Sequence, residues 1–439
     1  MTSSLLQKIS NYPISNHLEE ICTTLKKSSS RVLILTAETA AGKSTVLPLA
    51  LMDQFEGKIL MTEPRRLAVL GVANRLADLR DEETGAQVGY KIHLENKISK
   101  ETRLEVVTEG ILVHQLQEDP ALENYNVVVV DEFHERSVNT DLTVAFLKEA
   151  LELRDDLYVI IMSATINTEK LLTYFGGQGD SKVPVLNIPG RQFPVDISYN
   201  DKWSVCDAVE EALKLQKTGN ILVFLPGISD IRKNQELLEQ NLAALKNIEI
   251  CVLHSSISLE EQKRVISENN SPDLRRIILS SAIAETSLTV PGVTCVIDSG
   301  LARVNRMNIS TGMENLTTEV ESQFSAEQRA GRAGRICAGK CIRLWSEFDP
   351  RIKDFPPEIL RADITELVLE CVERGVFSFD GIDWLDKPNS GAWNESVKLL
   401  QNLGFLKSDG HITETGRKAL RLGIHPCSAG RRRARSCGI

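Results

Sequence analysis

The segment that most constrains the fold is residues 31–45, RVLILTAETAAGKST. Val32–Thr36 is an apolar, β-branched run typical of a buried strand, a turn of small residues follows, and Val46–Met52 predicts a helix. A strand that turns tightly into a helix presents main-chain N–H groups and a favourable dipole to an anion. We therefore expect a phosphate-binding loop, in which Lys43 reaches the β- and γ-phosphates and the Ser44 hydroxyl binds Mg²⁺.

An ordinary strand-to-helix turn is the alternative interpretation, because short motifs often match by chance. The loop also departs from the usual pattern, since Ala37 stands where a glycine is usual and Ala40 lies inside the turn. Without glycine, these positions must adopt negative φ angles or accept strain.

The composition is that of a soluble globular protein, with 42% hydrophobic and 25% charged residues. The 439 residues are enough for about two to four domains. A net charge of −9 argues against a chain that binds polyanions over its whole surface, but it allows a local basic channel. The nine cysteines are scattered, and Cys337 and Cys341 lack a second pair to complete a metal site, so we expect reduced thiols. No apolar run reaches transmembrane length and residues 1–30 lack a signal-peptide pattern, which predicts a cytoplasmic location.

Strand and helix patterns alternate twice along the chain, which predicts two α/β domains in tandem. We expect the first at residues 1–195, around a buried strand at Asn126–Asp131, and the second at residues 196–355. Residues 302–321 have a hairpin-like pattern. The pattern then changes to two helices and a Gly-punctuated hairpin, which predicts a small winged-helix domain at residues 356–425. Further strands are expected at residues 58–62, 103–108, 157–163, 220–225, 249–254, 276–280 and 294–298.

Two carboxylates follow the buried strand of the first domain. In an open α/β sheet, ligands bind at the carboxyl ends of the strands. Asp131 is therefore placed to hold Mg²⁺, and Glu132 to orient or deprotonate an attacking water. Incidental acids at a solvated strand end are the alternative, which the Lys43 loop in the same domain makes weaker.

The segment Gln328–Arg335, QRAGRAGR, carries arginines at i, i+3 and i+6, a spacing that puts them along one stripe of a helix. Three guanidinium groups cost too much to bury without anions, and their planar donors match phosphate oxygens. An arginine from a second domain stabilises the charge of phosphoryl transfer only when the domains close. The alternative is a solvated basic helix, but the small residues between the arginines argue against it.

Weaker motifs follow other strand ends. Ser163-Ala164-Thr165 offers hydroxyl groups to link a nucleotide site to the other domain, although this tripeptide is common. Four more motifs carry groups suited to holding a sugar–phosphate chain without reading bases, and ordinary turns explain each of them equally well. They are Pro64-Arg65-Arg66, Thr108-Glu109-Gly110, Pro226-Gly227 and Glu285-Thr286-Ser287.

Taken together, the motifs resemble those of the DEAH/RHA helicases of superfamily two, and among them the bacterial HrpB-type ATP-dependent helicases. The resemblance covers most of residues 15–425. It rests on eight motifs in the family's order: AETAAGKST, TEPRRLAV, TEG, DEFHERS, SAT, LVFLPG, AETSLT and QRAGRAGR. It implies two tandem RecA-like P-loop domains with ATP and Mg²⁺ in the cleft between them, single-stranded RNA across their top, and a winged helix after the second domain.

The resemblance also implies roles for individual residues. The catalytic set would be Glu132, Gln328, Arg332, Arg335 and His134, with the two arginines as arginine fingers and His134 coupling the cleft to the second domain. The nucleotide would be bound by Glu38, Thr39, Ala40, Ala41, Gly42, Lys43, Ser44, Thr45 and Arg75, and Mg²⁺ by Ser44, Asp131 and Glu132. RNA would contact Arg65, Arg66, Thr108, Gly227 and Thr286. Arg75 would stack on the adenine, but its aromatic partner falls at about Ile266, which predicts weak base discrimination.

Two segments depart from the family. Motif V usually reads T-N-I-A-E-T-S, whereas this chain has Ala282 at the Asn position and so lacks an amide that links the RNA and ATP sites. After Pro426 the family continues into a helical bundle domain, whereas residues 427–439 are Arg-rich and lack apolar periodicity. We expect a truncated or frameshifted product with an aberrant basic tail at residues 426–439; an RNA-binding tail is the alternative.

The sequence thus predicts an ATP-dependent RNA helicase that couples NTP hydrolysis to 3′-to-5′ movement along RNA or to its unwinding. Two alternatives stay open, an NTP-switched clamp on RNA and an inactive remnant with an intact fold. No obligate protein partner and no membrane association are evident in the sequence.

Overall fold

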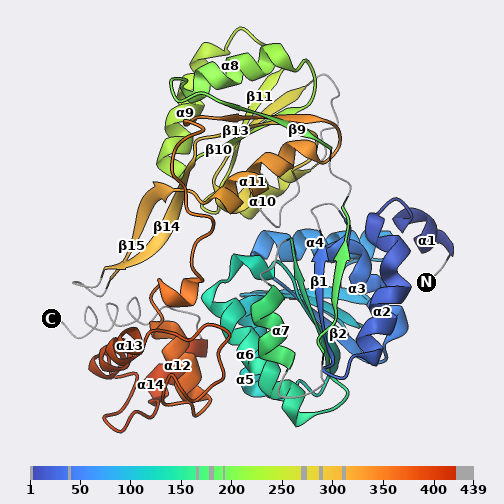
Figure 1. The fold of residues 1–439 in the computed structure, drawn as a ribbon, viewed down its shortest axis with the longest axis vertical. Coiled ribbons are helices and arrows are strands. Elements are labelled where there is room, and N and C mark those ends of the chain that lie inside the picture. Colours follow the sequence, from blue (N-terminus) through green and yellow to red (C-terminus); the bar gives the residue numbers. More distant parts are fainter. Residues whose placement is uncertain are drawn as a thin grey trace.

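The computed structural model describes residues 3–37, 41–164, 168–176, 182–190, 193–267, 274–285, 290–308 and 313–421. Within these ranges the chain forms two α/β domains, a projecting hairpin and a helical C-terminal unit (Figure 1). None of the helices described is both long and apolar enough to span a lipid bilayer.

The first domain is built on an eight-stranded sheet in the order β4-β3-β5-β2-β6-β7-β1-β8. Its neighbouring strands are parallel except for the antiparallel pair β3 and β4. The sheet interior is apolar on both faces, as a parallel sheet covered by helices requires. The strands are β1 Val32–Ala37, β2 Lys58–Glu63, β3 Val88–Ile92, β4 Glu95–Lys97, β5 Leu104–Thr108, β6 Tyr125–Val130, β7 Tyr158–Ser163 and β8 Val185–Ile188.

Helices cover both faces of this sheet. In β1, Leu33 and Leu35 face the core formed with α1 to α4, whereas Val32 and Ile34 face the core formed with α5 to α7, because side chains alternate along a strand. The helical elements are α1 Ser3–Ile9, η1 Pro13–His17, α2 Leu18–Lys27, α3 Lys43–Gln54, α4 Arg66–Leu79, α5 Glu109–Glu118, η2 Phe133–Glu135, α6 Val138–Leu153 and α7 Thr168–Gly176.

The second domain contains a six-stranded parallel sheet in the order β11-β12-β10-β13-β16-β9. Helices α8 and α9 cover one face, and α10 and α11 cover the other. The strands are β9 Val195–Tyr199, β10 Asn220–Phe224, β11 Ile248–Leu253, β12 Arg275–Ser280, β13 Val293–Asp298 and β16 Gly339–Arg343. The helical elements are α8 Val205–Leu215, α9 Ile228–Asn241, α10 Leu259–Ile266, η3 Ala282–Ala284, α11 Gln323–Gly331 and η4 Arg332–Gly334.

An antiparallel hairpin of β14 Leu301–Asn308 and β15 Met313–Val320 projects from the second domain toward the C-terminal unit (Figure 1). The Arg361 guanidinium of that unit donates a hydrogen bond to the main-chain carbonyl of Asn305 in the hairpin, at 3.3 Å. The hairpin thus connects the second domain to the C-terminal unit.

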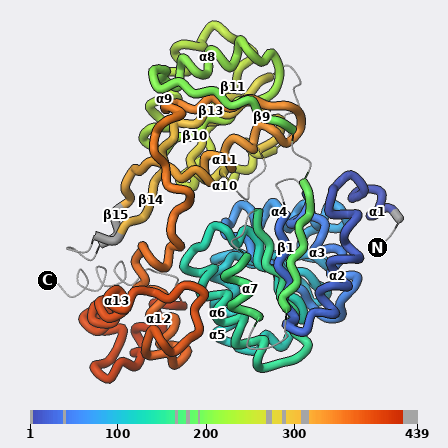
Figure 2. Tube along the Cα trace, viewed as in Figure 1, coloured from blue at the N-terminus to red at the C-terminus, as the bar shows by residue number. Residues whose placement is uncertain are grey.

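The C-terminal unit packs mainly against the first domain, beside α5 and α6 (Figure 2). Its apolar residues belong to the same continuous core as those of α5 to α7. Ion pairs join the surfaces, among them Arg374 with Glu149 at 2.8 Å and Arg136 with Asp386 at 2.7 Å. The unit contains η5 Glu358–Leu360, α12 Thr365–Glu373, α13 Ser390–Asn402, α14 Glu414–Arg421 and one antiparallel bridge between Leu406 and Ile412. Its assignment as a winged helix stays a prediction.

The two sheets, parallel except for the pair β3 and β4, confirm the predicted α/β class. Strand β8 completes the first sheet beside β1, and the next strand, β9, belongs to the second sheet.

Candidate active site

The predicted phosphate loop lies between β1 and α3. Gly42 has a φ angle of +92° and caps the N-terminus of α3, so Lys43 is the first helical residue. Ala37 is the buried last residue of β1 and is not among the residues with positive φ, so of the two alternatives, negative φ or strain, it adopts negative φ. Ala41 is buried, and its carbonyl accepts a hydrogen bond from the main-chain N–H of Ile14. The expected nucleotide-binding residues Glu38, Thr39 and Ala40 lie outside the described residues.

Three charged groups, Lys43, Asp131 and Glu132, form a buried active-site cluster at the carboxyl end of β6. The Lys43 Nζ lies 3.4 Å from Asp131 Oδ1 and 3.3 Å from Glu132 Oε1. The Ser44 hydroxyl donates to Asp131 Oδ2. The main-chain N–H of Glu132 donates to Asp131 Oδ1 at 2.7 Å, which supports the left-handed conformation of Glu132 (φ +50°).

The electrostatics of this cluster keep Lys43 charged. Burial lowers the pKa of Lys43, but Asp131 and Glu132 outweigh this effect and raise it above its usual value. Burial raises the pKa of Glu132, yet Lys43, His134 and Arg332 lower it to about 2. Burial raises the pKa of Asp131. Glu132 is therefore ionised at neutral pH, held by cations from both domains.

Sequence reasoning missed a third carboxyl group at this edge. Glu63 ends β2, the strand next to β6, and its side chain is fully buried beside Asp131. Burial and the two neighbouring carboxylates raise its pKa well above the usual value. The available signal was its place in TEPRR, directly after an apolar strand, because all parallel strands of the sheet end at one edge.

The second domain places its three arginines differently from the prediction. Helix α11 ends at Gly331 and a 3₁₀ turn follows, so Arg329, Arg332 and Arg335 do not lie along one continuous helical stripe. Phosphate was expected to explain all three buried guanidiniums. For Arg329 the structure supplies carboxylates of the protein itself instead.

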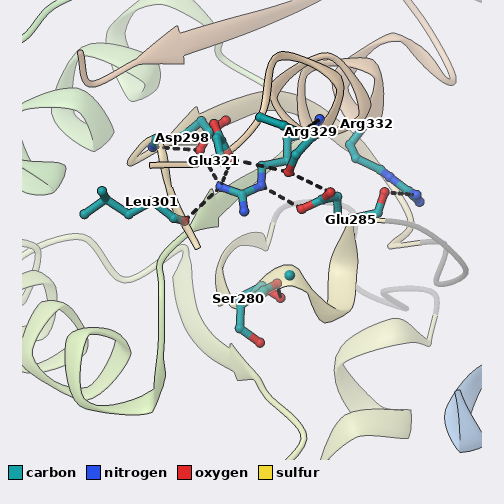
Figure 3. A network of polar contacts seen from close by, with 12 residues as sticks. Ser280, Glu285, Asp298, Leu301, Glu321, Arg329 and Arg332 are labelled. Carbon is teal, nitrogen blue, oxygen red and sulfur yellow. Dashed lines mark hydrogen bonds and ion pairs between the residues drawn. The ribbon is translucent and has the colours of Figure 1, made fainter. Parts of the chain in front are cut away.

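Arg329 is the centre of a buried network with Asp298, Glu285 and Glu321, the Arg329 network (Figure 3). Its guanidinium lies 2.8 Å from Asp298 Oδ1 and 2.9 Å from Glu285 Oε2, and it also donates to the Leu301 carbonyl. The network joins α11 to β13, to the start of the hairpin and to the segment after η3. No spacing in the sequence indicates this network, because Leu301, Asp298 and Glu285 lie 28 to 44 positions from Arg329 and only Glu321 is near it in the chain.

Arg332 and Arg335 face the first domain. Arg332 is 3% exposed, and its guanidinium donates to the main-chain carbonyl of Glu285. Burial and Arg335 lower the pKa of Arg332 well below its usual value, while Glu132 acts to raise it. Burial lowers the pKa of Arg335 to about 10, again against the charge of Glu132. Glu132 of the first domain therefore acts electrostatically on both arginines of the second.

His134 lies where the two domains meet. Its ring packs edge-on against Phe324 of α11, with centroids 5.5 Å apart. Its Nδ1 lies 3.3 Å from the Ser163 hydroxyl, while Thr165 of the same predicted motif is outside the described residues. Gln328 is half-buried on α11, one residue before Arg329.

Arg75 and Ile266, the expected pair around the base, lie on different elements. Arg75, on α4, is exposed and donates a hydrogen bond to the Tyr12 hydroxyl at 3.2 Å. Ile266 ends α10 and packs against Leu67 and Ala68 at the start of α4. The Thr45 side chain is half-buried in the first turn of α3.

The residues expected to contact RNA follow strand ends, but they are not equally available. The Arg65 guanidinium donates to the Ala282 carbonyl of the second domain at 2.9 Å and pairs with Glu135 at 3.4 Å. The Ala282 main chain thus provides an interdomain contact although the Asn side chain of the family is absent. Arg66 is exposed, and Thr108 precedes α5 as its N-cap. Gly227 is the buried N-cap of α9, and Thr286 lies outside the described residues.

The side chains around Lys43 fit a magnesium ion. They offer hydroxyl and carboxylate oxygens, and Mg²⁺ typically takes one or two protein carboxylates together with phosphates and water. Within the described residues, no group of three or more His, Cys, Asp or Glu side chains is arranged to hold a metal ion by itself. The seven described cysteines are free thiols, among them the exposed Cys337 and the buried Cys341.

Comparison with known proteins gives consistent results. Residues 17–173 match the model of the DEAD/DEAH box helicase family, and residues 204–337 match that of the helicase conserved C-terminal domain. The chain is 37% identical over 430 residues to the ATP-dependent RNA helicase HrpB of Escherichia coli K12, covering 95% of this chain and 52% of the relative. It is 36% identical over 440 residues to HrpA of the same organism, covering 95% of this chain and 33% of the relative.

Comparison with solved structures gives the same result as comparison of sequences. The crystal structure of E. coli DEAH/RHA helicase HrpB superposes with a TM-score of 0.86 at 37% identity, over 96% of this chain and 54% of that chain. The crystal structure of E. coli DExH-box NTPase HrpB gives a TM-score of 0.80 at the same identity, over 98% and 52%. The chain thus spans about half, or less, of the relatives it matches.

Proposed function

We propose that the chain is a helicase of the DEAD/DEAH box family, which hydrolyses ATP to ADP and phosphate and couples this reaction to RNA. The reaction would take place between two RecA-like domains, residues 1–195 and 196–355. The observation that carries the proposal is the position of the Lys43, Asp131 and Glu132 cluster at the domain interface, where His134 packs against Phe324 of the second domain and the charge of Glu132 acts on the buried Arg332 and Arg335. Phosphoryl transfer needs such an arrangement, because its catalysis is mostly positioning and charge stabilisation.

The first domain would bind the phosphates. Main-chain N–H groups at the start of α3 and the Lys43 ammonium attract the β- and γ-phosphates. Bound Mg²⁺ would neutralise phosphate charge, held by the Ser44 hydroxyl and Asp131, with Glu132 nearby. The remaining loop residues, Glu38, Thr39, Ala40, Ala41, Gly42 and Thr45, would surround the phosphates.

Glu132 would orient the attacking water. A pKa of about 2 keeps its carboxylate ionised, so it accepts a hydrogen bond from the water. Arg332 and Arg335 would donate to the γ-phosphate oxygens and stabilise the charge of the transition state. Gln328 would face the same phosphate, and His134 would transmit domain closure through Phe324.

RNA would lie across the strand ends of both domains, contacted through its sugar–phosphate chain by Arg66, Thr108, Gly227 and Thr286. Arg65 would join them once its contact with Ala282 is released. We assign 3′-to-5′ movement, a winged helix at residues 356–425 and a cytoplasmic location to the same proposal. Arg75 would stack on the base opposite the apolar Ile266, so other NTPs should also be hydrolysed.

The test is ATP hydrolysis by the purified chain with and without poly(U), followed by strand displacement on duplexes with a 3′ or a 5′ tail. We expect RNA to stimulate hydrolysis and only the 3′-tailed duplex to be separated. Stimulated hydrolysis without displacement of either duplex would favour an NTP-switched RNA clamp. Absence of hydrolysis at saturating ATP, Mg²⁺ and RNA would contradict the proposal.

A further inference from the structure

A short N-terminal segment lies against the phosphate loop and has no part in the activity proposed above. Residues 9–15 lead from α1 into η1, and Ile9 and Ile14 anchor them in the core of the first domain. The hydroxyl of Ser15 donates to the Ile9 carbonyl at 2.6 Å, and the main-chain N–H of Tyr12 donates to the same carbonyl at 3.0 Å. The segment is therefore a defined turn, and its fold presents Tyr12 to the loop.

The Tyr12 ring fills the space beside Gly42. A Cβ atom built on Gly42 would lie 2.8 Å from Tyr12 Cδ1 and 2.9 Å from Tyr12 Cβ, closer than real Cβ atoms approach. A glycine is thus required at position 42 for two reasons. The φ angle is positive, and the Tyr12 ring occupies the space that a side chain would need. The next residue in the loop is fixed by the same segment, because the N–H of Ile14 donates to the Ala41 carbonyl at 3.1 Å.

The Tyr12 hydroxyl contacts a second part of the same site. It accepts a hydrogen bond from Nη2 of Arg75 at 3.2 Å. Arg75 is exposed on α4, and an exposed arginine without a partner samples many rotamers. One side chain therefore supports the loop with its ring and restricts Arg75 with its hydroxyl.

We infer that Tyr12 is a positioning residue for the nucleotide, which fixes the phosphate loop at one end of the site and Arg75 at the other. The inference rests on the proposed function, because it requires a nucleotide at Lys43. Preorganised groups bind more tightly, because they lose less conformational freedom on binding. Tyr12 should therefore act mainly on nucleotide affinity.

The test compares Tyr12→Phe and Tyr12→Ala in the full chain by steady-state ATPase kinetics with saturating poly(U) and by titration with a fluorescent ADP analogue. Tyr12→Phe keeps the ring and loses the hydrogen bond, so KM for ATP and Kd for the analogue should rise about fivefold, with kcat within twofold of wild type. Tyr12→Ala also removes the ring from Gly42 and should raise both constants further and lower kcat. The matched control is Tyr158→Phe, at the amino end of β7 and so away from the carboxyl ends of the strands, which should leave all three constants unchanged.

A double-mutant cycle with Arg75→Ala separates positioning from general loss of structure. If the hydroxyl acts through Arg75, Tyr12→Phe has no further effect on KM once Arg75 is alanine. Additive effects of the two changes, or unchanged KM and Kd in both Tyr12 variants, would overturn the inference. Since Tyr12→Phe retains the packing, the cycle decides even if Tyr12→Ala lowers the melting temperature. Failure of the wild-type chain to bind the analogue would instead contradict the proposed function.

Discussion

The active-site cluster and the Arg329 network are both buried groups of opposite charges, but their contacts differ in length. Arg329 lies 2.8 Å from Asp298 and 2.9 Å from Glu285, the distances of charge-assisted hydrogen bonds. Lys43 lies 3.3 Å from Glu132 and 3.4 Å from Asp131, beyond that range. Arg329 is paired by carboxyl groups of its own domain, whereas the looser contacts of the cluster are ones that a ligand can replace.

Arg329 and Arg332 belong to one sequence motif, yet their surroundings differ in the same way. Although burial lowers the pKa of Arg329, the surrounding carboxylates raise it above its usual value. Burial and a neighbouring arginine lower the pKa of Arg332, only three residues later. An arginine among carboxylates stabilises the fold, whereas an arginine buried beside another arginine gains from an anion that comes from outside the protein.

The largest effect is expected for Arg332→Ala. Loss of the proposed arginine finger should lower kcat for ATP by at least about a thousandfold. The melting temperature should not fall, because the change removes a cation that burial disfavours. ATPase kinetics and thermal melting check both parts. A clear loss of stability with turnover within tenfold of wild type would place Arg332 in the structural group with Arg329.

Glu132→Gln should lower kcat by at least about a hundredfold, because an amide neither carries the charge nor accepts a proton from water. Nucleotide binding should persist, since Lys43 and the loop are unchanged. Kinetics and equilibrium titration with a fluorescent ADP analogue measure the two effects. Glu152→Gln, on the exposed face of α6, is the control and should match wild type. Turnover that survives in Glu132→Gln would show that another group orients the water.

Arg329→Met should reduce the free energy of unfolding by about 3–5 kcal/mol, because it leaves buried carboxylates without their cation. Arg306→Met is the matched comparison, since Arg306 also pairs with a glutamate at 2.8 Å but on the exposed hairpin. That change should cost less than about 1 kcal/mol. Urea unfolding of both variants measures the difference. Equal losses would mean that the network contributes no more than a surface ion pair.

Glu109 is a third kind of buried charged group, because its carboxyl group is hydrogen-bonded to hydroxyl groups and is not paired with a cation among the described residues. It accepts hydrogen bonds from Thr140 at 2.6 Å and from Ser137, and burial raises its pKa to about 7. Between pH 4.5, its ordinary pKa, and about pH 7, the folded state binds more protons than the unfolded state. The free energy of unfolding therefore falls as the pH rises through this window.

Glutamine does not titrate, so Glu109→Gln should lack this pH dependence. The free energy of unfolding of wild type minus that of the variant should therefore fall by up to about 1.4 kcal/mol per pH unit across this window. Urea unfolding at several pH values from 5 to about 8 tests the slope. Parallel pH profiles of the two proteins would show that Glu109 titrates normally.

The sequence allowed the central strands and the residues at their ends to be predicted. Strands such as β6 are continuous apolar runs, and the roles proposed for Asp131 and Glu132 rest on their place after such a run. Edge strands were harder, because β8 is partly exposed and short and gives no clear periodic signal. Parallel pairing then brings Glu63 beside Asp131, a contact that no spacing in the sequence indicates.

The different surroundings of Arg329, Arg332 and Arg335 were not predictable from their spacing. Whether a guanidinium meets phosphate or carboxylate depends on Asp298 and Glu321, which reach Arg329 only after β13 and the hairpin have folded. Tyr12 was missed for a similar reason. It lies 30 positions before Gly42 and belongs to no recognised motif, and only the packing of the N-terminal turn brings them together.

The shared core of the C-terminal unit and the first domain has a mechanical consequence. The chain leaves the first domain after β8, builds the second, and returns to the first at η5. The second domain is therefore connected at both of its ends to one body, formed by the first domain and the C-terminal unit. Two connections limit how far it can move away from that body, so repeated opening and closing would bring Arg332 back opposite Lys43.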